Sequence, residues 1–204
     1  MPPSLVLANY RTLLDQILAT AVDDATWTDA IFDQALRLAL ANYNDRFVYE
    51  TSFEVLTTGY SQNLSTISAL RDILAVAYPW SDGASFASLS RRFRTTADLT
   101  VYFDGCQPAD GEFIRVRHTK QHTIDDLDSA AATTVPDRHA TLLATYAASH
   151  ACRLRRRQLS ENPAIPDYAL AALTTAATDL YIQATDLLRT ARIADNPSWQ
   201  FIGL

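Results

Sequence analysis

The spacing of apolar residues changes twice along this chain of 204 residues, and that change limits the folds open to it. Near both ends, apolar side chains recur every three to four positions, which is typical of an α-helix with one buried face. Between the ends they alternate with more polar neighbours, which is typical of a half-buried β-strand. The sequence therefore predicts an α+β protein that is mainly helical, with an antiparallel β-sheet region inserted between its two helical ends.

Two helices are expected within the first 45 residues. Residues 5–21 carry one apolar stripe, formed by Leu7, Tyr10, Leu14, Ile17 and Ala21. A second helix is expected from Thr28 to about Asn44, because threonine caps helix starts well and Asp29 suits the positive end of the helix dipole.

The last third of the chain predicts two more helices. Pro136 is suited to the first turn of a helix that continues to about Leu159. Asn162 and Pro163 interrupt the pattern, Pro166 restarts it, and residues 167–193 form one long amphipathic stretch.

Alternation with period two marks the central strands. It covers residues 47–55 and, most clearly, 93–103, and it returns over 112–120, so we expect the last two segments to pair as a hairpin. Residues 70–78 fit either period, and we interpret them as a strand.

The terminal helices have apolar stripes that must be buried, and a four-helix bundle is the simplest way to bury them. We therefore expect residues 1–45 and 135–195 to form the bundle. Residues 46–134 would be the β-rich insertion, and residues 196–204 an apolar C-terminal tail.

The sequence has little that resembles an active site. It contains no phosphate-binding glycine loop and no zinc-protease or nucleophile motif, and its five glycines are scattered. Cys106 and Cys152 are expected to be free thiols in a reducing compartment. We expect no catalytic residue, no cofactor and no metal. The alternative is a metal-dependent hydrolase that uses His118, His122 and the aspartates of residues 125–128.

Composition and charge indicate a soluble protein, cytoplasmic at synthesis. The start of the chain lacks the positive region of a secretory signal, and the uncharged stretch 168–177 is too short to span a bilayer. A net charge of −6 argues against a protein that grips nucleic acid over its whole surface.

Two further features suggest contacts with partners. Arg153, Arg155, Arg156 and Arg157 form a basic run, which is either a solvated helix end or a site that contacts carboxylates of a neighbouring subunit or DNA phosphates. The tail carries Trp199, Phe201, Ile202 and Leu204. Burying four such side chains is worth roughly 6–10 kcal/mol, so the tail either folds back or docks in a partner.

The whole chain resembles the head–tail adaptor, or connector, proteins of tailed bacteriophages. The resemblance lies in the opening helix, in "TDAIFDQALRLALANYNDR", in "LTVYFDGCQPADGEFIRVRHT" and in the Pro-initiated, Ala-rich stretch "TTVPDRHATLLATYAASHACRLRRR". The large β insertion departs from the smallest, nearly all-helical members of that family.

The resemblance implies a non-enzymatic virion protein of the neck, assembled in the host cytoplasm. Its subunits would form a homo-oligomeric ring, typically of twelve, below the portal protein. The ring would extend the channel through which DNA passes and would offer a platform for a stopper or tail-completion protein. The resemblance also implies that the C-terminal segment, Trp199 to Leu204, reaches into the portal. A small cytoplasmic interaction or regulatory module, whose tail binds a cellular partner, is the other alternative.

Overall fold

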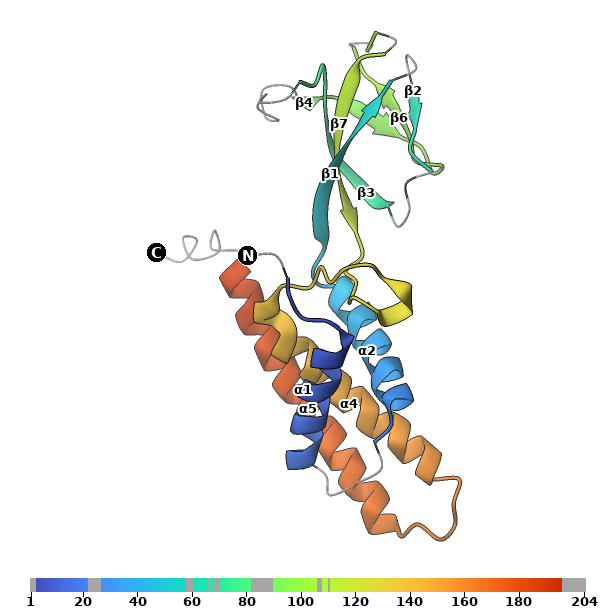
Figure 1. Cartoon of the computed structure of the whole chain (residues 1–204), viewed down its shortest axis with the longest axis vertical. Helices are drawn as coiled ribbons and strands as arrows, with labels where there is room; N and C mark the ends of the chain where they lie inside the picture. Colours follow the sequence, from blue (N-terminus) through green and yellow to red (C-terminus); the bar gives the residue numbers. More distant parts are fainter. Residues whose placement is uncertain are drawn as a thin grey trace. The chain divides into compact units, whose positions relative to one another are not determined.

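The computed structural model describes residues 3–21, 27–57, 61–65, 67, 70–81, 90–105, 108–109 and 111–195. The chain divides into two compact units. The first joins Met1–Arg46 to His122–Leu204, and the second is Phe47–Gln121 (Figure 1). The first is helical and the second is built from antiparallel strands, so the protein is α+β.

The described part of the helical unit contains four α-helices. They are α1 (Leu7–Ala21), α2 (Asp29–Asn44), α4 (Ala140–Leu159) and α5 (Asp167–Asp195), with short 3₁₀ turns η1 (Leu127–Ser129) and η2 (Asp137–His139). Each helix lies within a few residues of its predicted range. The predicted cap of α2 is confirmed, because the Thr28 hydroxyl accepts a hydrogen bond from the Ile31 amide at 3.4 Å.

Helix α4 is the centre of the helical unit, and it packs against α5, α2 and α1. Its residues from Ala140 to Cys152 are buried except Thr141 and His150. Many of them are alanines, and small side chains let neighbouring helices approach closely. The buried Ser149 hydroxyl donates to the Ala177 carbonyl of α5 at 2.9 Å, so its polar group is satisfied without water.

The segment that precedes α4 belongs to the helical unit. The His122 amide donates to the Asn44 side-chain oxygen at 2.7 Å, and the Thr133 hydroxyl donates to the Leu5 carbonyl at 2.5 Å. Asp137 accepts two hydrogen bonds from Ser4, one from its amide at 3.0 Å and one from its hydroxyl at 2.8 Å. We expected the insertion to run to residue 134. These bonds instead attach residues 122–134 to α2 and to the segment that leads into α1, and the second unit ends at Gln121.

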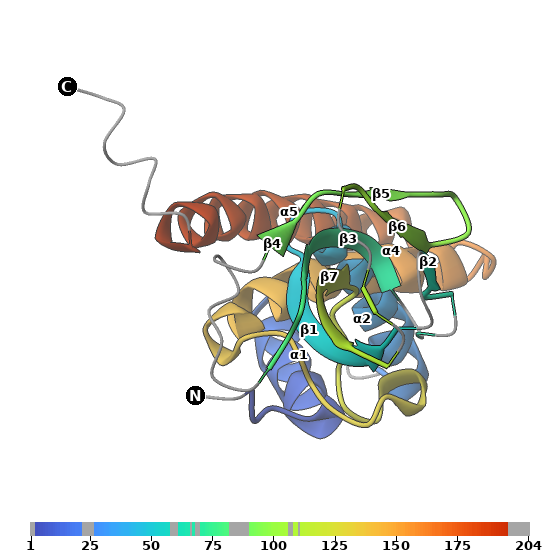
Figure 2. The same cartoon turned by 90° about the horizontal axis from the view of Figure 1, so that it is seen from above.

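The second unit contains two antiparallel sheets. Its strands are β1 (Tyr49–Leu56), β2 (Ser61–Asn63), β3 (Leu70–Ala77), β4 (Ser90–Arg91), β5 (Phe93–Thr95), β6 (Thr100–Phe103) and β7 (Phe113–Lys120). One sheet has the order β1-β7-β3-β4 and the other the order β2-β6-β5. Figure 2 shows β1, β7 and β3 as curved neighbours. The core of the second unit is formed by Leu64, Val76, Val101, Phe103, Ile114 and Val116.

Two predictions about the strands are wrong. Residues 93–103 are not one strand, because the chain turns between Thr96 and Leu99 and the flanking strands β5 and β6 pair with each other. The Leu99 amide donates to the Thr96 carbonyl at 3.0 Å, and Leu99 has φ +59°, in the left-handed region that turns use. The expected hairpin is also absent: β6 pairs with β2 and β5, whereas β7 pairs with β1 and β3.

No helix in the described part of the chain is long and apolar enough to cross a membrane.

We expect the packing around α4 to control the stability of the helical unit. Replacing the fully buried Leu143 by alanine removes methyl groups and leaves a cavity, which costs about 2–5 kcal/mol. Leu38→Ala, at a position that is 37 % exposed on α2, is the matched control and should cost much less. Denaturant unfolding followed by circular dichroism measures both, and equal losses would contradict this account of the core.

Candidate interaction site

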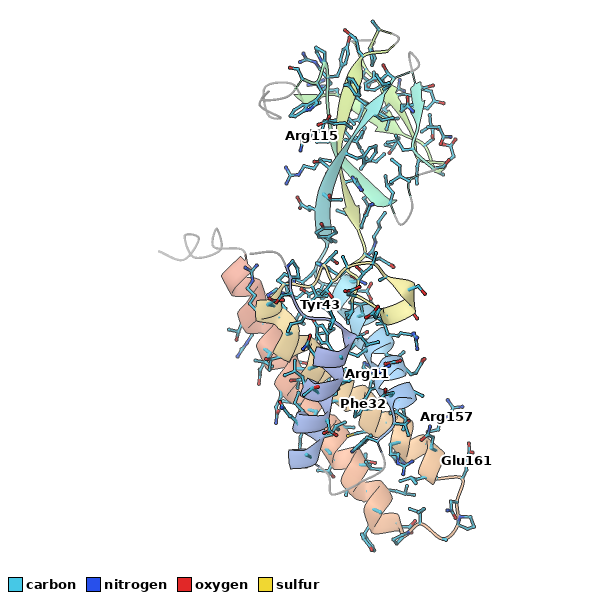
Figure 3. All side chains as sticks on the ribbon, viewed as in Figure 1. Arg11, Phe32, Tyr43, Arg115, Arg157 and Glu161 are labelled. Atoms are coloured by element: carbon cyan, nitrogen blue, oxygen red, sulfur yellow. The ribbon has the colours of Figure 1, made fainter. Side chains whose placement is uncertain are left out.

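The basic run occupies the last turns of α4. The Arg153 guanidinium lies 5.3 Å from the centre of the Tyr181 ring of α5, a cation–π contact. Tyr181 also meets Tyr146 edge to face, with 5.8 Å between ring centres. Arg156 and Arg157 are exposed in the final turn, where Figure 3 shows Arg157. The structure thus joins one of the predicted arginines, Arg153, to an aromatic pair that the sequence did not indicate, because Tyr181 is on another helix.

His150 lies on the same stripe of α4 as Arg153. Its Nε2 accepts a hydrogen bond from the Asn42 amide group of α2 at 3.0 Å, which requires that nitrogen to be unprotonated. Burial first, and then the positive charge of Arg153, lowers the pKa of His150 below 6.5. The imidazole is therefore neutral beside the arginines at neutral pH.

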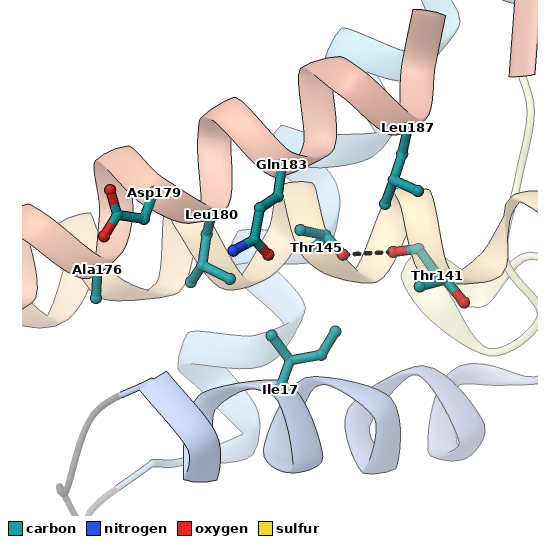
Figure 4. A pocket seen from close by; sticks show the side chains of 8 residues that line it. All are labelled: Ile17, Thr141, Thr145, Ala176, Asp179, Leu180, Gln183 and Leu187. Carbon is teal, nitrogen blue, oxygen red and sulfur yellow. Dashed lines mark hydrogen bonds between the residues drawn. The ribbon is translucent and has the colours of Figure 1, made fainter. Parts of the chain in front are cut away.

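A groove lies on the other flank of α5. It has a volume of about 460 Å³ and is lined by α1, α4 and α5 (Figure 4), through Ile17, Thr141, Thr145, Ala176, Asp179, Leu180, Gln183 and Leu187. The Thr145 hydroxyl is already bonded to the Thr141 carbonyl at 2.8 Å. The groove therefore has a mixed lining, with apolar side chains from α1 and α5, two threonines from α4, and the carboxylate and amide of α5. Sequence reasoning did not find it, because its lining comes from three helices far apart in the chain.

The exposed surface of α5 is rich in threonine. The hydroxyls of Thr174, Thr175, Thr178, Thr185 and Thr190 each donate to the carbonyl four residues earlier, at 2.8–3.2 Å. Since these donors are satisfied within the helix, a protein that packs on this surface need not supply an acceptor for them.

The two histidines of the hydrolase alternative, His118 and His122, are both buried. His122 is buried, its Nδ1 donates to the Thr134 carbonyl at 3.0 Å, and burial lowers its pKa. His118 is buried on β7 with its ring edge to face with Phe53, and burial lowers its pKa too. Asp128 forms an ion pair with Arg37 at 2.7 Å. Within the described residues, no three histidine, cysteine or acidic side chains are grouped so that they could hold a metal.

The predicted portal-binding residues Trp199, Phe201, Ile202 and Leu204 lie outside the described residues, as does Cys106.

The sequence matches no protein-family model, and no curated protein is significantly similar to it.

We expect Cys152 to be unreactive in the folded protein. It is a free, fully buried thiol, and burial raises its pKa to about 11, so almost none of it is the nucleophilic thiolate. In a Cys106→Ser variant, a thiol-reactive chromophore should label Cys152 at least about a hundredfold more slowly before unfolding than after it. Equal rates in both states would contradict the packing of α4.

We expect Arg153→Gln to raise the pKa of His150, because the substitution removes a nearby positive charge. Arg156→Gln is the control and should change it less, and NMR titration of the imidazole measures both. Because the folded-state pKa of His150 lies below the unfolded value of 6.5, the neutral imidazole contributes stability above pH 6.5. This stability is lost as the pH falls below 6.5 and through the folded-state pKa. The loss should be smaller in Arg153→Gln, and an unchanged titration would contradict the assigned contact.

Proposed function

We propose that this chain is a structural head–tail adaptor of a tailed bacteriophage, a component of the neck. The observation that carries the proposal is the organisation of the chain. Residues from both ends form one helical unit, and a β unit with its own core is inserted between them. The order of two helices, strands and two further helices is the one on which the resemblance to the adaptor family rests, although the large β unit departs from the smallest members of that family.

In this proposal α1, α2, α4 and α5 act as a four-helix bundle, and copies of the bundle assemble side by side into a ring, typically of twelve. The ring sits below the portal protein and extends the DNA channel. The β unit meets the stopper or tail-completion protein. The subunits assemble in the host cytoplasm and end in the neck of the virion.

The proposed mechanism is scaffolding, with no chemical step. Two of the residues that a hydrolase would need are already used in the fold: His122 is bonded to a backbone carbonyl and Asp128 to Arg37. The net charge of −6 supports a conduit, because each pairing of a phosphate with a basic side chain adds affinity and would slow the DNA that slides past.

We expect the apolar tail to attach the ring to the portal. Deleting residues 198–204 removes four large apolar side chains and should abolish binding to purified portal rings. The helical content of the chain should remain unchanged in circular dichroism. Ser198→Ala with Gln200→Ala is the control, because it alters only polar residues of the same segment and should leave binding intact.

Binding is measured by cosedimentation with the portal and by electron microscopy of the complex. Unchanged attachment of the truncated chain would refute the anchor assignment. A full-length chain that remains a monomer and ignores the portal would refute the adaptor function as a whole, and would favour the interaction-module alternative.

A further inference from the structure

We propose that the two flanks of α5 are the two halves of one contact between copies of this chain, in which the basic flank of one copy occupies the groove beside Asp179 of the next. The inference rests on the proposed function only in assuming that copies of the chain assemble. It adds which surfaces of each copy make the contact.

The receiving surface is the groove between α1 and α5. Ile17 and the 38 % exposed Leu187 offer apolar contact there. Asp179 lines the groove, and Asp186 lies two turns further along the same stripe of α5, where it also faces the exposed Arg189 at 3.7 Å. The groove thus combines a hollow, apolar contact from Ile17 and Leu187, and the carboxylate of Asp179.

The entering surface is formed by the end of α4 and the adjacent side of α5. Tyr181 is 42 % exposed there, with the Arg153 guanidinium over its ring. Arg157 lies one turn beyond Arg153 on the same stripe and is exposed. An exposed tyrosine with an arginine over its ring has the composition that protein interfaces favour at their centres.

The placement of these surfaces selects a head-to-tail contact. Tyr181 and Asp179 are two residues apart on α5, which places them about 200° apart around the helix, on opposite flanks. A two-fold contact of either flank with itself would bring like charges together. A contact between unlike flanks pairs opposite charges and leaves each copy with one flank free for the next, which is the geometry that closes into rings.

Charge and apolar area have different roles in this contact. Exposed ion pairs contribute little affinity individually, but they reject wrong pairings and set the register. The affinity would come mainly from the apolar walls and from Tyr181. The threonine-rich surface of α5 between the flanks can be covered without loss of hydrogen bonds, because its hydroxyls are bonded within the helix.

The test uses two charge-inverted forms of the full chain. One carries Arg153→Asp and Arg157→Asp, so both its flanks are negative. The other carries Asp179→Arg and Asp186→Arg, so both are positive. All four positions are exposed, so both forms should fold, which circular dichroism checks. Arg46→Asp with Arg92→Asp is the control, since it changes the net charge as much as the first form does but at exposed positions elsewhere.

Assembly is measured by native mass spectrometry and sedimentation, with the chain alone at high concentration and with portal rings. We expect each inverted form alone to associate at least tenfold more weakly than the natural chain. An equimolar mixture should assemble with the two forms alternating, and a chain with all four substitutions should assemble by itself. The control should behave like the natural chain.

Each of the remaining outcomes shows which part of the inference, or of the proposed function, is wrong. If the inverted forms assemble as the natural chain does, this contact is wrong while ring formation stands. If neither the equimolar mixture nor the fourfold variant recovers assembly, the pairing of these two flanks is wrong. If the first form assembles normally but loses DNA retention, the basic flank faces nucleic acid and the inference fails. If the natural chain does not assemble in either condition, the proposed function falls as well.

Discussion

The helical unit depends on the burial of α4. From Ala140 to Cys152 almost every side chain of this helix is covered, by α5, α2 and α1. Five of the eleven buried residues are alanines, which lets the neighbouring helices lie close. Ser149 is accommodated because it bonds to the Ala177 carbonyl of α5. Helices from the two ends of the chain therefore pack against one central helix, α4, although the β unit separates them in sequence.

The same arrangement determines which surfaces remain exposed. Helix α5 packs chiefly on α4, so its buried stripe is narrow, and both flanks of that stripe stay open. One flank borders α1 and forms the groove with Asp179, while the other borders the end of α4 and carries Tyr181 under Arg153. A long helix that is only partly covered, with opposite charges on its two flanks, is well suited to a subunit that repeats around a ring.

The β unit is organised differently, around a core between its two sheets that its own residues form. Much of the outer side of β1 and β7 is polar: Arg117 bonds to Glu50 at 2.5 Å, and Arg115 lies 3.6 Å from Glu54 and stacks over Trp80. The cross-strand pair Leu56 and Phe113 at the end of these strands is about half exposed. These exposed pairs contribute little stability each, but they keep the sheet surface polar. A unit with a core of its own can be inserted between two helices without using residues of the helical core.

The sequence alone determined the features that depend on neighbours along the chain. Helix ranges follow from a local period, and the Thr28 cap follows from a hydroxyl three residues before the amide it binds, so both were predictable. The turn at Thr96–Leu99 was missed, because alternating residues continue through it and alternation does not reveal a left-handed backbone at Leu99. Only the tertiary structure decided that β6 pairs with β2 and β5, that residues 122–134 belong with the helices, and that Ile17, Thr141 and Asp179 line one groove. Each of these joins segments far apart in the chain, and a local pattern shows which face of an element is buried but not which partner covers it.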